Sequence, residues 1–174
     1  MPRGADDRDE AFGAYVAGRA DAMRSTAYLL CGDWHLAEDI VQNAFIKLYA
    51  AWYRVVRHEV LDGYVRRIVV RTYLDERRRG WRRERATESL PETAAVPVGD
   101  PESRIMLLRA LAAVPPRQRA VLVLRFWEDL DIAATARLLG CSTGTVKSQT
   151  SRGLDALRTA LDLAEATAQN EEMA

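Results

Sequence analysis

The stretch from residue 131 to 157, DIAATARLLGCSTGTVKSQTSRGLDAL, constrains the fold of this chain more than any other segment. Apolar residues recur at helical spacing on both sides of Gly140, which predicts two helices joined by a tight turn. Gly140 can adopt the positive φ that ends a helix, and Ser142 or Thr143 can cap the next one. Small Ala136 allows the two helices to cross closely. This arrangement is typical of a helix-turn-helix, whose second helix enters the DNA major groove.

The polar residues of the second helix suit a contact with DNA. Five outward residues of this helix are hydrogen-bond donors or dual donors and acceptors, and none of the five is acidic: Lys147, Ser148, Gln149, Ser151 and Arg152. Arg and Lys pair well with guanine, Gln with adenine, and Ser or Thr with phosphate oxygens. The expected DNA-binding residues are Thr143, Thr145, Lys147, Ser148, Gln149, Ser151 and Arg152. An ordinary helical hairpin with a solvated polar face is the alternative.

The rest of the chain also has helical spacing of its apolar residues. These residues make up 48% of the 174 residues, which is enough for a real core and argues against wholesale disorder. The spacing predicts helices over residues 10–31, 34–54, 63–83, 102–113 and 116–127, with a frayed polar stretch before them. Asp33 is expected to cap the second of these, and Pro116 to open the last.

A proline-bearing segment, ATESLPETAAVPVGDP, interrupts this helical pattern and is typical of a linker. The sequence therefore predicts an all-α fold of two small helical domains joined by a flexible linker, with a helix-turn-helix in the C-terminal domain. The expected boundaries are 10–85 for the first domain, 86–100 for the linker, 101–163 for the second domain and 164–174 for a tail.

Residues 54–85 form a basic stretch in a chain whose formal net charge is zero. The stretch holds eleven arginines against five acidic residues, and aromatic residues are interleaved with them. Positive charge along a backbone together with stacking rings suits single-stranded or melted DNA. A solvated, Arg-rich helix with aromatic residues in the core is the alternative interpretation.

The sequence speaks against several other classes of protein. Neither Cys31 nor Cys141 has metal-ligand spacing, and both are expected to be reduced and mostly buried. With two histidines, no Gly-rich phosphate loop and no nucleophile beside a base, we expect no catalytic residue, no metal and no cofactor. The chain has no apolar signal core and no apolar run of membrane length, so we expect a cytoplasmic protein without membrane insertion.

Four sequence blocks lie in order between Phe12 and Leu163. They are AEDIVQNAFIKLYAAW, GYVRRIVVRTYLDERRR, VPPRQRAVLVLRFWEDL and GCSTGTVKSQTSRGLDALR. Together they resemble a bacterial RNA polymerase sigma factor of the extracytoplasmic-function group, and most of all the actinobacterial SigE-like family. The resemblance implies a dissociable sigma factor that binds core RNA polymerase, recognises −35 and −10 promoter elements and promotes transcription initiation, without catalysing a reaction.

The resemblance also implies roles for individual residues. Residues 10–85 would be the second sigma domain and 101–163 the fourth, whose helix at 143–157 would read the −35 element. Contact with the β′ clamp helices of the polymerase would involve Asp39, Gln42, Asn43 and Lys47. The −10 element would be opened and read by Arg57, His58, Tyr64, Arg66, Arg67 and Arg71. The β flap of the polymerase, promoter DNA and an anti-sigma factor are the other implied partners.

The chain departs from the family pattern at three places. Asn43 stands where Glu is frequent, Arg71 where Asn is common, and Leu61-Asp62 where a proline often occurs. Two other functions remain open at this point: a helix-turn-helix repressor that works without polymerase, and a regulatory module that only sequesters its partners. An exposed loop histidine without a function is the alternative interpretation of His58.

Overall fold

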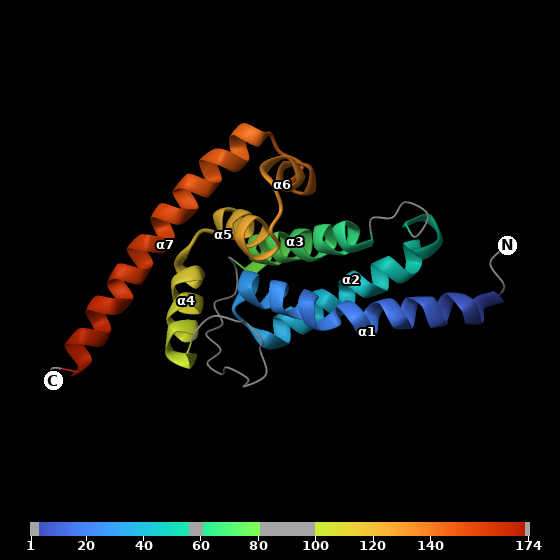
Figure 1. The fold of residues 1–174 in the computed structure, drawn as a ribbon, viewed down its shortest axis with the longest axis horizontal. Coiled ribbons are helices and arrows are strands. Elements are labelled where there is room, and N and C mark those ends of the chain that lie inside the picture. The colour runs from blue at the N-terminus through green and yellow to red at the C-terminus, as the bar shows by residue number, and fades with distance from the viewer. Residues whose placement is uncertain (1–3, 56–60, 81–99, 173–174) are drawn as a thin grey trace.

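The computed structural model describes residues 4–55, 61–80 and 100–172, and it confirms the predicted all-α fold (Figure 1). We call residues 4–80 the first half; it contains α1 (Gly4–Cys31), α2 (Trp34–Val55) and α3 (Leu61–Gly80). We call residues 100–172 the second half; it contains α4 (Pro101–Ala113), α5 (Pro116–Leu122), the π-helical turn η2 (Val123–Trp127), α6 (Ile132–Leu139) and α7 (Thr143–Glu172). No described helix is long and apolar enough to cross a membrane.

Side-chain caps set the starts of several helices. The Asp33 carboxylate accepts the backbone N–H of Leu36 at 2.9 Å, as predicted for the start of α2. The Asp131 carboxylate accepts the N–H of Ala134 at 2.6 Å and opens α6. Pro116 occupies the first turn of α5, where its missing N–H leaves no hydrogen bond unmade.

Helix α1 begins at Gly4, six residues before the start that the sequence predicts. Its first turns are held by a contact that apolar spacing cannot reveal. Arg8 Nη2 donates to the carbonyl of Tyr49 at 2.6 Å, and the guanidinium lies over the Tyr49 ring at 3.7 Å from its centroid. A cation–π contact to α2 therefore extends α1 beyond its apolar stripe.

Helix α7 differs from prediction at its other end. It runs without a break to Glu172, whereas a tail was expected from residue 164. Near its start it crosses α5 at Gly153, where an added Cβ would lie 3.1 Å from Leu122 Cγ. Glycine therefore lets these two helices approach closely, and the free end of α7 projects away from the bundle (Figure 1).

The π-helical turn η2 changes the direction of the chain between α5 and α6. The N–H of Glu128 bonds the carbonyl of Val123 at 3.0 Å, five residues back, and the N–H of Leu130 bonds that of Leu124 at 3.0 Å. Asp129 follows with a φ of 51°. The sequence predicts one continuous helix to Trp127, and a change of helix type inside that span has no signal in apolar spacing.

The two halves share one hydrophobic core among the described residues. Leu111, Val123 and Leu124 of the second half are buried in the same cluster as Leu30 and Tyr73 of the first. Each half therefore buries apolar surface of the other, and removal of apolar surface from water stabilises the folded chain. Residues 86–99 of the predicted linker lie outside the described part of the chain, as do Arg57 and His58.

Arg119 of α5 crosses between the halves and is only 2% exposed. Its guanidinium donates to the carbonyl of Leu30 at 2.7 Å, of Ala112 at 2.5 Å and of Val114 at 3.1 Å. Leu30 lies in the last turn of α1 and Ala112 in the last turn of α4. A helix C-terminus carries partial negative charge, so one cation is stabilised by two helix ends at once.

Candidate nucleic-acid interface

The predicted helix-turn-helix is present as α6 and α7. Gly140 adopts a φ of 66° at the end of α6, and the N–H of Cys141 bonds the carbonyl of Ala136 at 3.0 Å. Of the two expected caps, Ser142 is the one used: its hydroxyl accepts the N–H of Thr145 at 3.0 Å. A small buried cluster of Val121, Ala136 and Val146 holds α7 on α6.

Most of the polar residues predicted on α7 are exposed to solvent. These are Thr143, Thr145, Lys147, Ser148, Ser151 and Arg152. Gln149 differs, because it is half-buried and lines a recess of about 430 Å³ with Gln118 of α5 and Arg77 and Arg78 of α3. The first half therefore lies beside Gln149, whereas the other six residues can meet a DNA groove.

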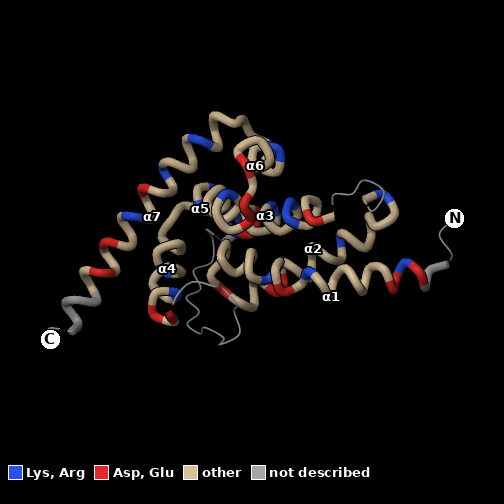
Figure 2. The backbone as a smooth tube through the Cα atoms, in the orientation of Figure 1, with Lys and Arg blue, Asp and Glu red and all other residues tan. Residues whose placement is uncertain are grey.

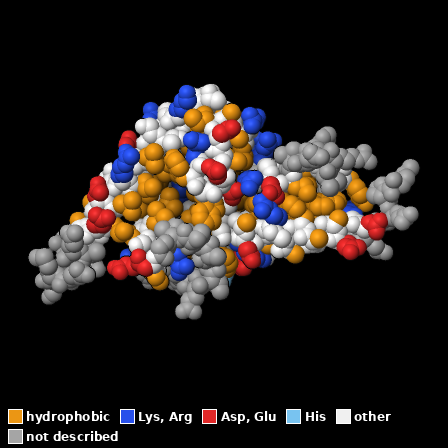
Figure 3. All heavy atoms as spheres, viewed as in Figure 1, with side chains coloured by type: hydrophobic (Ala, Val, Ile, Leu, Met, Phe, Trp, Pro, Cys, Tyr) orange, Lys and Arg blue, Asp and Glu red, His pale blue; other side chains and the backbone are white. Residues whose placement is uncertain are grey.

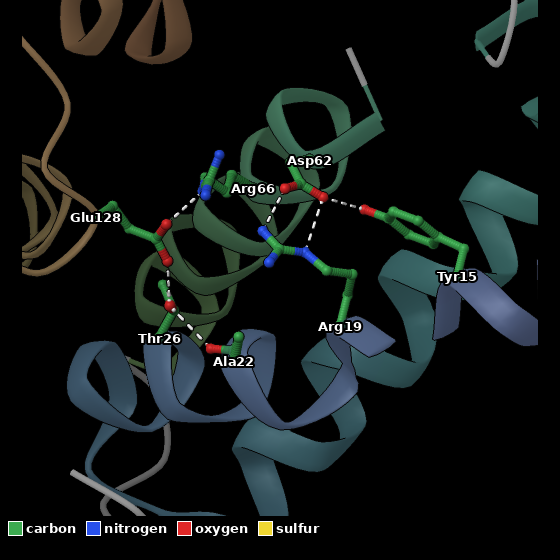
Figure 4. A network of polar contacts seen from close by, with 7 residues as sticks. All are labelled: Tyr15, Arg19, Ala22, Thr26, Asp62, Arg66 and Glu128. Atoms are coloured by element: carbon green, nitrogen blue, oxygen red, sulfur yellow. Dashed lines mark hydrogen bonds and ion pairs between the residues drawn. The ribbon is translucent and has the colours of Figure 1, made fainter. Parts of the chain in front are cut away.

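The residues predicted on α3 divide into two groups. Arg67 and Arg71 are exposed, and Tyr64 is half-buried. Arg66 instead points toward the second half, with 19% of its side chain exposed, and its Nε donates to the carboxylate of Glu128 (Figure 4). Figure 2 shows this acidic turn between α5 and α6 lying against the basic α3.

A groove of about 960 Å³ lies between the halves beside this ion pair. It has four guanidinium groups, two tyrosines and an apolar floor. The residues that line it are Tyr15, Arg54, Val55, Leu61, Asp62, Gly63, Tyr64, Arg66, Arg67, Leu130, Ala134, Arg137 and Leu138. Three of the six residues predicted for −10 contact thus border a groove whose other wall is α6.

The start of α3 is anchored to α1 by Asp62 (Figure 4). Its carboxylate accepts the Tyr15 hydroxyl at 2.8 Å and pairs with the guanidinium of Arg19, whose Nε lies at 3.0 Å. Burial and this hydrogen bond raise the pKa of Tyr15, so its hydroxyl remains a donor. In the sequence, Asp62 is notable only as a departure from the family pattern. Its partners Arg19 and Tyr15 lie 43 and 47 residues earlier in the chain, and the sequence does not indicate that they contact it.

The residues predicted for polymerase contact lie on one exposed face of α2. Asp39, Gln42, Asn43 and Lys47 are all exposed. Ile46 lies among them and is 70% exposed. Sequence reasoning missed Ile46, yet it left a signal: Ile46 falls outside the apolar stripe of its helix.

Two further tyrosines extend this face toward the end of α2. Tyr49 is 37% exposed and Tyr53 is 45% exposed. Tyr49 also donates to the carboxylate of Asp9 at 2.7 Å, a hydrogen bond that raises its pKa. Polar and aromatic residues around an exposed isoleucine are the kind of surface that protein interfaces use.

The cysteines form no metal site with the described residues. No group of three or more His, Cys, Asp or Glu there could hold a metal ion. Cys31 and Cys141 are free and half-buried. Burial raises the pKa of the Cys31 thiol to about 11, and the thiol donates to the carbonyl of Asp33 at 3.1 Å.

Comparisons with known proteins agree with this arrangement of helices. Residues 16–83 match the family described as Sigma-70 region 2, and residues 104–157 match the one described as Sigma-70, region 4. The chain is 35% identical to the RNA polymerase sigma-E factor of Streptomyces avermitilis, over 87% of this chain and 85% of that protein. It is 36% identical to the ECF RNA polymerase sigma factor SigE of Mycolicibacterium smegmatis, over 82% of this chain and 58% of that protein.

Solved structures with a similar fold include that of the sigma factor RpoE of Bartonella quintana, in complex with the anti-sigma factor NepR. The TM-score is 0.70 at 23% sequence identity, and the match covers 88% of this chain and 98% of that one.

Proposed function

The chain belongs to the sigma-70 family of RNA polymerase sigma factors, and from that premise we propose how its two halves divide the work of initiating transcription. The first half binds core polymerase through α2 and the −10 element through α3. The second half binds the −35 element through α7. The observation that carries this proposal is the exposed polar row on α7, directly after a glycine turn and a serine cap.

The exposed face of α2 supports its role as the site for the β′ clamp helices. Asp39, Gln42, Asn43 and Lys47 supply charge and hydrogen bonds around Ile46. The α2 helix is packed against α1 and α3 on its opposite side, where Ile40, Phe45 and Trp52 are buried. A partner helix can therefore bind here without disturbing the core.

The proposed −10 surface combines α3 with the residues that precede it. Arg67 and Arg71 can hold a DNA backbone, and Tyr64 can stack on an unpaired base. The proposed −10 surface also includes Arg66, Arg57 and His58, which are assigned to it from their positions in the sequence. Because Arg71 is a long cation in place of a common Asn, we expect it to contact phosphate rather than read a base.

The −35 surface is the row on α7 from Thr143 to Arg152. Lys147 and Arg152 suit guanine or phosphate, and the serines suit phosphate. Hydrophobic side chains also gather where α4, α5 and α7 meet, and Figure 3 shows them on one face of the molecule. We assign this apolar surface to the β flap of the polymerase.

Three further features belong to the proposal. The protein works in the cytoplasm, where RNA polymerase is found, and it performs no covalent chemistry of its own. An anti-sigma factor controls it, as the complex of the Bartonella sigma factor with NepR suggests by analogy. A repressor that works without polymerase would have no use for the face of α2 around Ile46.

Run-off transcription with reconstituted holoenzyme tests the function as a whole. In a separate equilibrium binding assay, Arg152→Ala should weaken binding to a −35 duplex by roughly 1–3 kcal/mol, because it removes one base or phosphate contact. Arg109→Ala on α4 is the control, since it also removes an exposed arginine but lies outside the predicted DNA-binding row of α7. Equal −35 affinity in the two variants would show that the DNA face of α7 is assigned wrongly.

The polymerase contact is tested separately with the double variant Asp39→Ala and Gln42→Ala. Surface changes of this kind usually alter stability by no more than about 0.5 kcal/mol, so the variant should fold. Its affinity for core polymerase should fall, and Asp21→Ala on the exposed side of α1 should leave it unchanged. If the double variant binds core polymerase normally, the face of α2 is not the docking site.

A further inference from the structure

We propose that Asp62 is a positioning residue for promoter opening: two side chains of α1 hold it and so fix the first turn of α3, which places Tyr64 for contact with the −10 element. This inference rests on the −10 role proposed above for α3, and it adds a residue that acts on DNA only through its neighbour. We call Tyr15, Arg19 and Asp62 the α3 anchor (Figure 4).

The α3 anchor is a set of three hydrogen bonds to one carboxylate. Asp62 Oδ1 accepts the Tyr15 hydroxyl at 2.8 Å and Arg19 Nε at 3.0 Å, and Asp62 Oδ2 accepts Arg19 Nη2. Arg19 therefore meets the carboxylate with two donors side by side, a geometry that fixes direction as well as distance. The compact charge of a lysine ammonium would fix the distance alone.

Tyr15 connects the α3 anchor to α2 as well. Its ring centroid lies 6.5 Å from that of Phe45, in an edge-on arrangement, and 6.0 Å from that of Trp52. Both of these residues are buried on α2, so the Tyr15 ring is packed in place and its hydroxyl is a fixed point for Asp62. Helices α1 and α2 together thus set where α3 begins. Because α2 also carries the proposed polymerase face, the α3 anchor joins the −10 surface to the polymerase-bound helix at a defined position.

Tyr64 is the DNA-binding candidate that this placement affects most directly. It follows Asp62 by two residues, in the first turn of α3. It borders the groove of about 960 Å³ together with Tyr15 and Asp62, and it also borders a recess of about 470 Å³ beside Lys47 and Tyr53 of α2. A shift of the first turn of α3 would therefore move the Tyr64 ring relative to both hollows.

The α3 anchor is poorly suited to a purely stabilising role. The side chains of Arg19 and Asp62 are 35% and 36% exposed, and ion pairs with this much contact with water add little to stability. The inner face of α3 is already buried along its length through Val65, Val69 and Tyr73. Helix α3 can therefore fold and pack without the α3 anchor, which adds a fixed place and direction for the first turn.

The test compares Arg19→Lys with Arg24→Lys in the full chain, assembled with core polymerase. Both variants keep the positive charge on α1 and lose the planar guanidinium. Arg24 is the matched control, because its ion pair with Asp21 at 2.8 Å joins two residues of α1. The probe is a duplex promoter that gives a run-off transcript with the wild-type holoenzyme. It carries 2-aminopurine in its −10 segment, and the fluorescence of this base rises when it unstacks.

We expect the Arg19→Lys holoenzyme to open this duplex at least about five-fold more slowly than the Arg24→Lys holoenzyme, the lower end of a typical coupling between sites. The two variants should have equal affinity for core polymerase and for a −35 duplex, because the exposed face of α2 and the row on α7 do not depend on the first turn of α3. A residue that only stabilised the fold would lower all three activities together.

Tyr15→Phe weakens the α3 anchor in a second way. Phenylalanine keeps the ring against Phe45 and Trp52 and removes the hydroxyl donor, so opening should again be slower than with Arg24→Lys. Circular dichroism confirms that each variant folds, and Tyr15→Phe decides the question should Arg19→Lys fail to fold.

Equal opening rates for Arg19→Lys, Tyr15→Phe and Arg24→Lys would overturn the positioning role. A loss of affinity for core polymerase and the −35 duplex by the same factor as the loss of opening would overturn it too. Failure of the proposed function has a different signature, since Tyr64→Ala would then open the duplex as fast as the wild type. Slow opening by Tyr64→Ala, with normal opening by both variants of the α3 anchor, refutes the positioning role alone.

Discussion

Single residues join segments that are far apart in this sequence. Arg119 bonds a carbonyl 89 residues away, and Glu128 bonds a hydroxyl 102 residues away. Each such contact is satisfied only in the folded chain, so its loss leaves a buried polar group unpaired. These residues are therefore where substitutions should have their largest effects.

Arg119→Met is the clearest case. It keeps most of the apolar stem and removes three hydrogen bonds to backbone carbonyls, two of them buried, so we expect a loss of about 2–4 kcal/mol in the free energy of unfolding. Urea denaturation followed by circular dichroism measures it. Arg117→Met, two residues earlier and exposed, is the control and should change stability by no more than about 0.5 kcal/mol. Equal stability of the two variants would mean that Arg119 does not join the helix ends.

Cys31 should resist alkylation at pH 8. Its pKa is raised to about 11 by burial, so the thiol is protonated at this pH and only about one molecule in a thousand carries the thiolate. Reaction should speed up as the pH rises toward that value. Iodoacetamide labelling followed by peptide mass spectrometry should modify Cys141 first. Equally fast labelling of both cysteines at pH 8 would contradict the burial of Cys31.

At the scale of elements, the sequence predicted most of the helices because their signals are local. Apolar spacing located the inner faces, and Asp33, Ser142 and Gly140 marked ends that the structure confirms. The start of α1 and the π-helical turn were missed. The contact of Arg8 with Tyr49 and that of Glu128 with Arg66 accompany these two features, and neither contact can be predicted from apolar spacing.

The crossing of α5 and α7 can be tested at Gly153. Replacement of glycine by alanine inside a helix usually stabilises the helix by about 1 kcal/mol. Here its Cβ would lie 3.1 Å from Leu122 Cγ, and overpacking of this kind costs about 1–3 kcal/mol. We therefore expect Gly153→Ala to lower the melting temperature.

Gly144→Ala is the matched control for this crossing. It lies on the same helix, and its nearest neighbour to an added Cβ is Ser142 Oγ at 3.7 Å. With ordinary van der Waals space available, it should raise the melting temperature or leave it unchanged. A higher melting temperature for both variants would show that α5 and α7 are not in close contact at residue 153.

At the scale of the whole molecule, the sequence predicted two helical domains but not their shared core. From the sequence alone, Leu111 and Val123 could equally belong to the core of a separate second domain, whereas the structure places them in the shared core. The candidate site was predicted in the same way: the residues exposed on α2 and α7 follow from helical faces, whereas the occupation of Arg66 by Glu128 depends on how the halves meet. Local patterns indicate which face a residue occupies, but they do not indicate what that face contacts.

The tether between the halves should matter for transcription and not for the packing of the halves on each other. Residues 86–100 span at most about 50 Å when fully extended, and deletion of eight of them reduces this to about 23 Å. The shortened chain should keep its melting temperature and its radius of gyration, because the shared core holds the halves. It should lose run-off transcription from promoters that need both elements. Full activity on such promoters would show that the halves do not separate by that distance.

The π-helical turn has a consequence for changes in chain length. A π turn accommodates one more residue than an α turn of the same span, so η2 behaves as a built-in insertion of a single residue. Phe126 within it is 61% exposed, and its removal would let the segment return to α-helical geometry. The residues that follow would then keep their orientation about the helix axis, because the α turn covers the same span with one residue fewer. We therefore expect the contact between Glu128 and Arg66 to survive a one-residue deletion within η2.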